Sequence, residues 1–205
     1  MKIIKSKDKI EIKDPDDFNV IQTLNCGQIF RYVIDGQTAI VYSLDKRSKI
    51  NFDERTITIQ SDDIDYFYNF FDLDTDYTYI KNELRKDEFL KSAVDYGYGI
   101  RIIKNDVYEM LISFIISANN NIGRIKKSIE YLCSHFGKNM GEYFAFPTLR
   151  ELKRASIDDF RSAGLGYRAE QMYDTVQRLT DEDIAKLRLM DKDGQAKCLF
   201  SLNGV

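Results

Sequence analysis

The sequence has little of what metal centres and disulfide frameworks require. It contains one histidine, His135, and three widely separated cysteines, Cys26, Cys133 and Cys198. An odd number of distant cysteines in apolar surroundings indicates buried thiols in a reducing compartment and not a disulfide framework. Because the sequence contains no cluster of several Cys and His residues, we expect no transition-metal site and no bound cofactor.

Long apolar runs and flexible linkers are also lacking. Residues 1–13 alternate charge with isoleucine, and no later stretch approaches the roughly 18 uninterrupted apolar residues of a membrane span. No tract rich in Pro, Ser or Gly divides the chain. We therefore expect a cytoplasmic, monomeric protein without a membrane partner. Its 43% hydrophobic and 31% charged residues are typical of a globular chain with a sizeable core.

The charge balance is acidic overall but basic in one region. A net charge of −3 and a pI of about 5.4 argue against a nucleic-acid-binding protein when the chain is taken whole. Residues 97–178, however, carry 12 Lys and Arg against 9 Asp and Glu. This imbalance is compatible with DNA binding through a few placed cations, and solvated helix faces produce it as well.

Two kinds of periodicity divide the chain near residue 60. Before it, apolar residues alternate with polar ones in five segments: 10–12, 30–34, 40–44, 49–52 and 56–60. The Asp35-Gly36 pair predicts a hairpin with a primed turn and positive φ at both central positions. After Ser61, which we expect to cap a helix, apolar residues recur every three or four positions. The pattern predicts an antiparallel meander followed by helices.

Helical signals fill the rest of the chain. Residues 107–116 are apolar nearly all round, which is typical of a central helix. Residues 148–151 and 156–159 have the spacing of capping boxes, and Gly137 and Gly164 stand where helices normally end.

Three consecutive asparagines, 119–121, follow the apolar segment. Their short carboxamides can cap the next helix, satisfy loop carbonyls or face a ligand, and capping is the more common role. The amphipathic helix predicted at 122–136 has Arg124 near its beginning. A cation there opposes the helix dipole and hints weakly at an anionic partner.

Two glycine-containing segments are candidates for ligand contact. In 163–169, two glycines frame a helix start at which Tyr167 and Arg168 emerge, a pair that can wedge into a base stack and bond to a base edge or phosphate. A half-buried tyrosine beside a solvated arginine is the simpler interpretation. In 24–32, Gly27 lets backbone approach a ligand closely, and a tight turn into a strand explains it equally well.

The C-terminal segment has an apolar face at Ala196, Leu199, Phe200 and Leu202 and then an Asn-Gly turn signal at 203–204. Such a signal usually ends one helix and leads into another. We expect the chain to end inside a helix-turn-helix connection. Either the sequence was cut there or the protein does without the helix that would cover this face.

Taken in order, these segments resemble one family, from about Gln22 to the last residue. The matching motifs are Cys26-Gly27-Gln28-Ile29-Phe30-Arg31-Tyr32, Phe71-Asp72-Leu73-Asp74, the segment 113–125 around Asn119-Asn120-Asn121, Gly164-Leu165-Gly166-Tyr167-Arg168-Ala169, and Leu202-Asn203-Gly204-Val205. They are similar to the 8-oxoguanine DNA glycosylases of the helix-hairpin-helix superfamily. The resemblance implies an α+β fold, in which a small antiparallel N-terminal sheet domain packs on a mainly helical body.

The implied domains are residues 1–75, the sheet domain with a closing helix, and residues 76–205, the helical glycosylase domain. The second domain would end inside the helix-hairpin-helix motif, with its C-terminal part missing.

The resemblance also implies roles in reading double-stranded DNA that contains 8-oxoguanine opposite cytosine. An enzyme that works on one base of a duplex must flip it out, fill the gap and satisfy the partner base. By analogy Asn119 occupies the vacated space and Tyr167 wedges beside the orphaned cytosine. Arg124 and Arg168 donate to its acceptor edge, a task that suits a fixed, always charged guanidinium.

The damaged base itself would be met by the N-terminal motif. Oxidised guanine carries a hydrogen on N7 that guanine lacks, and the resemblance assigns the backbone carbonyl of Gly27 to accept it. Gln28 and Phe30 are the other residues implied to bind this base. Three residues are implied to contact DNA phosphates: Asn120, Asn121 and Gly204.

The catalytic step is where the sequence departs from the family. Bifunctional members use a lysine amine to attack C1′, forming a Schiff base that leads to strand cleavage, and an aspartate stabilises developing positive charge. Both residues would lie beyond Val205, so this chain is expected to hold no catalytic residue and to be inactive alone. Lys192 and Lys197 precede the hairpin and are not expected to substitute. A second polypeptide carrying the remainder would restore activity.

Three alternative functions remain open. A non-catalytic damaged-DNA-binding module would bind the lesion without forming an adduct that borohydride traps. An alkylated-base glycosylase of the same superfamily would use an electron-rich aromatic cavity and need no contact from the Gly27 carbonyl. A helical interaction protein with an incidental asparagine run would show no salt-dependent affinity for DNA.

Overall fold

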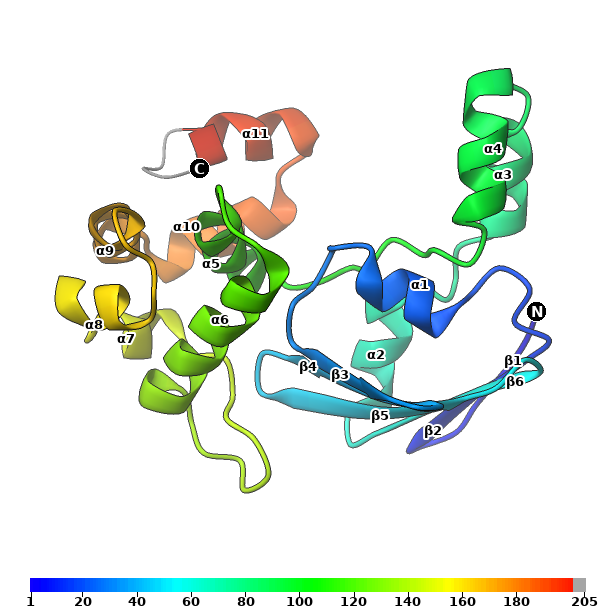
Figure 1. Ribbon diagram of the computed structural model, residues 1–205, viewed down its shortest axis with the longest axis horizontal. Helices are drawn as coiled ribbons and strands as arrows, with labels where there is room; N and C mark the ends of the chain where they lie inside the picture. Colours follow the sequence, from blue (N-terminus) through cyan, green and yellow to red (C-terminus); the bar gives the residue numbers. More distant parts are fainter. Residues whose placement is uncertain (201–205) are drawn as a thin grey trace. The chain divides into compact units, whose positions relative to one another are not determined.

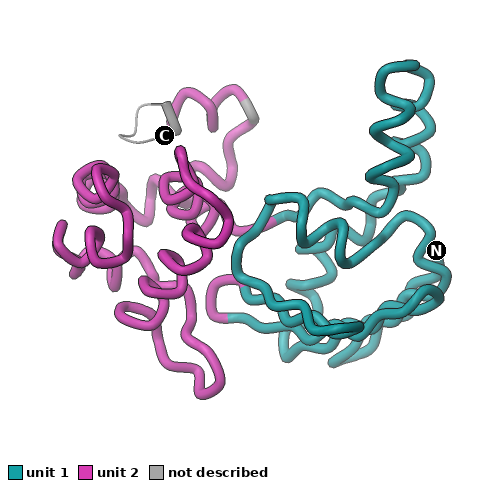
Figure 2. Tube along the Cα trace, viewed as in Figure 1, with its two compact units in different colours: residues 1–42, 46–104 teal, residues 43–45, 105–205 magenta. Residues whose placement is uncertain are grey.

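The structure, a computed structural model, describes residues 1–200 and contains two compact units (Figure 2). The sheet unit comprises residues 1–42 and 46–104, and the helical unit comprises residues 43–45 and the chain from residue 105 onward. The boundary therefore falls after residue 104, later than the expected boundary after residue 75. Contacts of Arg101, given below, explain the difference.

The sheet unit is built on six antiparallel strands. They are β1 (Lys2–Lys5), β2 (Lys9–Lys13), β3 (Tyr32–Asp35), β4 (Thr38–Ser43), β5 (Lys46–Phe52) and β6 (Thr56–Ser61). Their order in the sheet is β1-β2-β6-β5-β4-β3 (Figure 1). The antiparallel sheet is confirmed. The alternation pattern missed β1 because the side chains of this edge strand are mostly exposed.

The hairpin predicted at Asp35-Gly36 forms, but with a different turn. Asp35 pairs with Thr38, so the two central positions are Gly36 and Gln37. Gly36 has φ +54°, whereas Gln37 is not among the residues with positive φ. The expectation of positive φ at both central positions is therefore wrong. Glycine at the first central position alone is the pattern of type II′ turns.

Two helices cover one face of the sheet (Figure 1). The apolar side chains of α1 (Val20–Asn25) and α2 (Ile64–Phe70) share one core with the inward-facing residues of the strands. These residues include Ile10, Ile12, Ile50, Ile57 and Ile59, each at most 2% exposed. The N-cap of α2 is Asp63 and not Ser61, because Ser61 is still paired in β6.

The C-terminus of α2 is closed by an unusual backbone conformation. Asp72 has φ +52°, in the left-handed region. Its amide donates to the Asn69 carbonyl at 2.8 Å, and the Leu73 amide donates to the Tyr68 carbonyl at 3.2 Å. This is the Schellman pattern, in which the chain turns sharply at the helix end. It leaves the carbonyls of the following residues free to meet another part of the chain.

After this turn the chain forms a helical hairpin and returns to the sheet. The hairpin consists of α3 (Tyr77–Leu84) and α4 (Glu88–Tyr96). Residues 97–104 then run beside α1, where the Thr23 hydroxyl donates to the Gly99 carbonyl at 3.1 Å.

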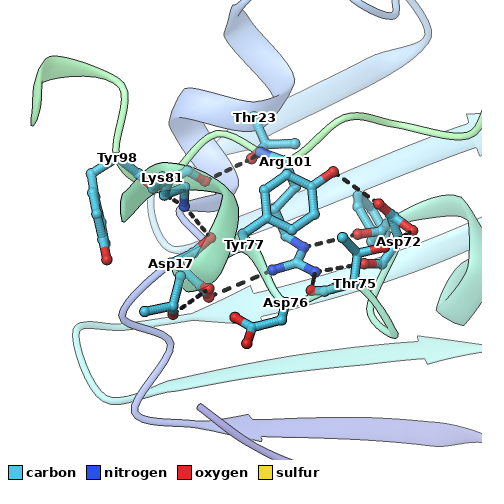
Figure 3. A network of polar contacts seen from close by, with 12 residues as sticks. Asp17, Thr23, Asp72, Thr75, Asp76, Tyr77, Lys81, Tyr98 and Arg101 are labelled. Carbon is cyan, nitrogen blue, oxygen red and sulfur yellow. Dashed lines mark hydrogen bonds and ion pairs between the residues drawn. The ribbon is translucent and has the colours of Figure 1, made fainter. Parts of the chain in front are cut away.

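Arg101 joins this returning segment to the end of α2 (Figure 3). Its side chain is 0% exposed. The guanidinium donates to three backbone carbonyls, those of Phe71 (3.1 Å), Asp72 (2.5 Å) and Thr75 (3.0 Å). It also lies 3.5 Å from the Asp17 carboxylate and 4.1 Å from the centroid of the Tyr77 ring. Because a buried charge is costly without partners, residues 97–104 stay with the sheet unit.

The helical unit is arranged around α5. Its helices are α5 (Val107–Ser117), α6 (Ile122–Phe136), α7 (Leu149–Leu152), α8 (Ile157–Ser162), α9 (Arg168–Arg178), α10 (Asp181–Leu189) and α11 (Lys192–Phe200). As predicted, α5 is central: Leu111, Ile112, Ile115 and Ile116 are all buried. The buried Glu109 carboxylate accepts from the Leu44 amide at 2.7 Å, which groups residues 43–45 with this unit.

The predicted helix boundaries are confirmed by hydrogen bonds. Complete capping boxes begin α7 and α8, at 148–151 and 156–159. Gly137 ends α6, and a Cβ there would stand 2.0 Å from the Ala145 carbonyl oxygen, so a larger residue does not fit. Gly164, with φ +85°, closes α8. Within residues 1–200, none of the helices has both the length and the apolarity needed to cross a membrane.

We expect Arg101→Met to lower the free energy of unfolding by about 3–5 kcal/mol, because the buried Asp17 carboxylate loses its ion-pair partner and keeps only the hydrogen bond from the Thr78 hydroxyl. Urea denaturation of the full chain measures this change. Arg101→Lys should restore little of the loss, since one ammonium cannot replace the planar fork that reaches several carbonyls. A methionine variant as stable as the wild type would contradict the role of Arg101.

Asp72 should make stability depend on pH. Burial opposes ionisation, but hydrogen bonds from Lys104, Thr75 and Tyr77 outweigh it and hold the pKa of Asp72 below its ordinary value. Such a carboxyl stabilises the fold above an unfolded pKa of about 4 and loses this effect as pH falls through the folded value. We expect the stability difference between wild type and Asp72→Asn to be largest near neutral pH and to shrink below about pH 4. A difference independent of pH would contradict this.

Candidate nucleic-acid interface

The three asparagines form the loop between α5 and α6. As predicted for capping, the Asn121 carboxamide accepts from the Arg124 amide at 3.0 Å. Asn120 donates from Nδ2 to the Ile116 carbonyl at 3.1 Å and accepts from the Asn121 amide at 3.0 Å. Asn119, with φ +47°, is exposed, and its carboxamide takes no part in these contacts. Two asparagines therefore hold the loop, and the third faces solvent.

The start of α9 reverses one expectation from the sequence. Tyr167 is 62% exposed, whereas Arg168 is only 6% exposed. Arg168 donates from Nη1 to the carbonyl of Ala118, the residue before Asn119. The interpretation as a half-buried tyrosine beside a solvated arginine is therefore wrong. The arginine is buried because it joins α9 to the loop between α5 and α6.

The hydrogen bond between Arg168 and Ala118 brings two of the sequence motifs together. We use the name loop platform for residues 118–121, the loop between α5 and α6, together with residues 167–168 at the start of α9. The Arg168 guanidinium lies 5.3 Å from the centroid of the Tyr167 ring. Its Nε is buried and has no hydrogen-bond partner in the described part of the chain. A buried donor without a partner is unfavourable, and an incoming acceptor would relieve this.

Positive charge lies beside the loop platform on α6. Arg124 is exposed in the first turn of this helix, and Lys126 follows half-buried. Burial lowers the pKa of Lys126. The first turn of α6 contains no acidic residue, so its backbone amides and Arg124 together favour an anion.

Gly27, Gln28 and Phe30 lie in the sheet unit, between α1 and β3. Gly27 has φ +91°, which disfavours other residues, and no atom lies within 4 Å of the place where a Cβ would stand. Gln28 donates from Nε2 to the Arg101 carbonyl at 2.9 Å and accepts from the Ile103 amide at 2.8 Å. Phe30 is half-buried. Gly27 thus has open space beside its backbone, while the side-chain amide of Gln28 is already hydrogen-bonded within the protein.

The remaining predictions concern the C-terminus and bound groups. Gly204 lies outside the described residues, and Lys197 is exposed on α11. Within residues 1–200, no group of three or more His, Cys, Asp and Glu side chains is arranged to hold a metal ion. A cavity of about 400 Å³ in the helical unit is lined by Tyr108, Phe146 and Arg188 among others, and includes no residue of the loop platform.

Arg101 and its contacts were missed by sequence reasoning. The residue stands in the apolar run Ile100-Arg101-Ile102-Ile103, where the alternation gives no sign that the charged side chain points inward. A charge between isoleucines was the one available signal. Its partners come from residues about 26–30 positions earlier, which local patterns do not connect.

The two arginines of the interface should differ in their effect on stability. We expect Arg168→Ala to lower the free energy of unfolding by about 1–3 kcal/mol, since it removes a buried hydrogen bond to Ala118. Arg124→Ala should stay within about 0.5 kcal/mol of wild type, because this side chain is exposed. Urea denaturation distinguishes them, and equal losses would argue against the loop platform.

Comparison with known proteins agrees with the motifs. Residues 10–111 match the family model described as 8-oxoguanine DNA glycosylase, N-terminal domain. The chain is 38% identical over 131 residues to the N-glycosylase/DNA lyase OGG1 of Arabidopsis thaliana, a match that covers 59% of this chain and 36% of that protein. The chain thus spans about a third of the length of this curated relative.

Two crystal structures of the Clostridium acetobutylicum 8-oxoguanine glycosylase/lyase match nearly the whole chain. The apo form is 32% identical with a TM-score of 0.89, and the match covers 99% of this chain and 75% of that one. The complex with double-stranded DNA containing cytosine opposite 8-oxoguanine is 31% identical with a TM-score of 0.91, covering 100% and 74%. At this identity over three quarters of a solved relative, the chain belongs to the 8-oxoguanine DNA glycosylase/lyase family.

Proposed function

We propose that this chain recognises 8-oxoguanine opposite cytosine in duplex DNA, as part of a DNA glycosylase/lyase of base-excision repair. The observation that carries the proposal is the loop platform, where Asn119 and Tyr167 are exposed beside the buried Arg168. The clostridial relative has been solved in complex with DNA containing this base pair, which supports the same partner here.

Base flipping would use the exposed residues of the loop platform. Removing one base from the stack costs a few kcal/mol, which inserted side chains help to offset. Asn119 would occupy the vacated space and Tyr167 would wedge beside the orphaned cytosine. Because Asn120, Asn121 and Arg168 already hold the loops, little further ordering is needed when DNA binds.

The orphaned cytosine would receive hydrogen bonds from Arg124 and Arg168. Cytosine opposite a flipped base exposes acceptors that lose their partners. The Nε of Arg168 is a donor without a partner, and a guanidinium has five N–H groups, so one bond to Ala118 leaves others for the base. Arg124 is exposed and needs no rearrangement to reach a ligand.

Gly27 would distinguish the lesion from guanine. The N7–H of 8-oxoguanine can donate to the Gly27 carbonyl, whereas guanine has an acceptor at N7 and cannot. The open space around Gly27 supports a close approach of the base. Phe30 would complete this side of the base site.

DNA phosphates would lie at helix starts. We assign them to the backbone near Asn120 and Asn121 at the beginning of α6, where the helix dipole favours an anion. We also infer that α11 is the first helix of a helix-hairpin-helix element. Its turn at Asn203-Gly204 would be a further phosphate contact and lies outside the described residues.

Base removal and strand cleavage would follow by lysine attack on C1′. The resemblance places this lysine and its aspartate after Val205, so a polypeptide carrying them would complete the reaction, in a monomeric cytoplasmic enzyme. Borohydride trapping on an 8-oxoguanine:cytosine duplex, with the polypeptide that carries the lysine present, distinguishes this proposal from a non-catalytic module. Preference for an alkylated base would instead favour the other glycosylase class.

Gly27→Ala should weaken binding to an 8-oxoguanine:cytosine duplex by about tenfold and binding to a guanine:cytosine duplex much less, because the added methyl obstructs the one contact that reads the lesion. Titration of both duplexes at one salt concentration measures the two losses.

Gly141→Ala is the matched control for this experiment. Gly141 also has φ +91° and open space around its Cβ position, so both variants should lose stability to a similar extent, about 1 kcal/mol or more. Gly141→Ala should leave the ratio of the two affinities unchanged. Equal losses on both duplexes in Gly27→Ala would sink the assignment of Gly27.

A further inference from the structure

Two glutamines hold the returning segment of the sheet unit in the same way. Gln22 donates from Nε2 to the Tyr96 carbonyl at 3.0 Å and accepts from the Gly99 amide at 2.9 Å. Gln28 repeats this pattern further along the chain, with the Arg101 carbonyl at 2.9 Å and the Ile103 amide at 2.8 Å. Each side-chain amide thus satisfies one carbonyl and one N–H outside the described strands. Gln28 bonds to the returning segment at both ends, whereas Gln22 bonds to it at Gly99 and to Tyr96, the last residue of α4.

The returning segment, residues 97–104, is also held in place by the contacts of Arg101. Three backbone carbonyls and the Asp17 carboxylate surround the buried guanidinium (Figure 3). The Arg101 amide also donates to the Thr23 hydroxyl at 3.2 Å. The carbonyl and amide that Gln28 contacts therefore belong to a segment that Arg101 holds by several hydrogen bonds.

Gln28 directly follows Gly27, so the hydrogen bonds of its side chain also restrict the peptide group that joins the two residues. The carbonyl of Gly27 and the amide nitrogen of Gln28 belong to one planar peptide group. Gly27 alone cannot fix the direction of this carbonyl, because glycine has wide conformational freedom and nothing lies within 4 Å of its Cβ position. The side-chain amide of Gln28 is held by two hydrogen bonds, to the Arg101 carbonyl and from the Ile103 amide. Its Nε2 also lies 3.0 Å from the Cys26 sulfur.

We propose that Gln28 is a positioning residue for lesion recognition, which holds the Gly27 carbonyl in the direction that accepts N7–H and is itself anchored on the segment fixed by Arg101. This inference rests on the proposed role of Gly27. It differs from the sequence-based assignment of Gln28 to direct contact with the base, since both ends of its amide are already bonded within the protein.

The two glutamines supply a matched experiment. Gln28→Met and Gln22→Met each keep the length of the side chain and remove one donor and one acceptor to the backbone of residues 96–103. Urea denaturation should show similar losses of stability. The ratio of affinities for 8-oxoguanine:cytosine and guanine:cytosine duplexes should fall about fivefold or more in Gln28→Met and change less than about twofold in Gln22→Met.

Hydrogen exchange of the backbone amides adds a readout that does not involve DNA. The Ile103 amide should exchange faster in Gln28→Met and the Gly99 amide in Gln22→Met, because each variant removes the side-chain acceptor of that amide. If Gln28→Met does not fold, Gln28→Asn takes its place, since its shorter amide cannot reach both partners.

The outcomes separate this inference from the proposed function. Loss of lesion preference and faster exchange of the Ile103 amide, both confined to the Gln28 variant, support it. An unchanged ratio of the two affinities in Gln28→Met, or equal changes of this ratio in both variants, overturns the role of Gln28. In that case the proposed function still stands if the wild-type chain prefers the lesion duplex. A wild-type chain with equal affinities for the two duplexes contradicts the proposed function, and the role of Gln28 in reading the lesion falls with it.

Discussion

The buried guanidinium of Arg101 is the contact on which the sheet unit depends most. A charge away from solvent needs acceptors on every side, and the carbonyls after α2 supply most of them. They face the arginine because the left-handed conformation of Asp72 turns the chain at the end of α2. The arginine in turn holds residues 97–104, the segment to which Gln28 bonds. One buried charge therefore supports the loop that carries Gly27.

The helical unit also contains a buried arginine that supports a loop. Arg168 is buried, donates to the main chain at Ala118 and so joins α9 to the loop between α5 and α6. In both units a buried arginine supports a loop that carries an exposed residue expected to meet DNA, Gly27 in one and Asn119 in the other. Rigid support of this kind reduces the conformational entropy lost on binding and keeps the contact atoms in place.

Local signals predicted most of the fold, and contacts between distant residues account for what they missed. The alternation of β2, β5 and β6, the capping boxes and the cap at Asn121 depend on neighbours within a few residues. The burial of Arg168 depends on a carbonyl 50 residues away, so the expected exposures of this residue and Tyr167 came out reversed. The candidate site residues were found through motif resemblance, which gives positions in the chain but not which side chains support the others.

Lesion recognition is tested most directly by titrating the unmodified chain with 8-oxoguanine:cytosine and guanine:cytosine duplexes of the same sequence. Both titrations need the same salt concentration, because phosphate contacts make DNA affinity strongly salt-dependent. We expect the lesion duplex to bind about tenfold more tightly, the size of one hydrogen bond gained by N7–H and denied to guanine. Equal affinities for the two duplexes would contradict recognition of the lesion by this chain.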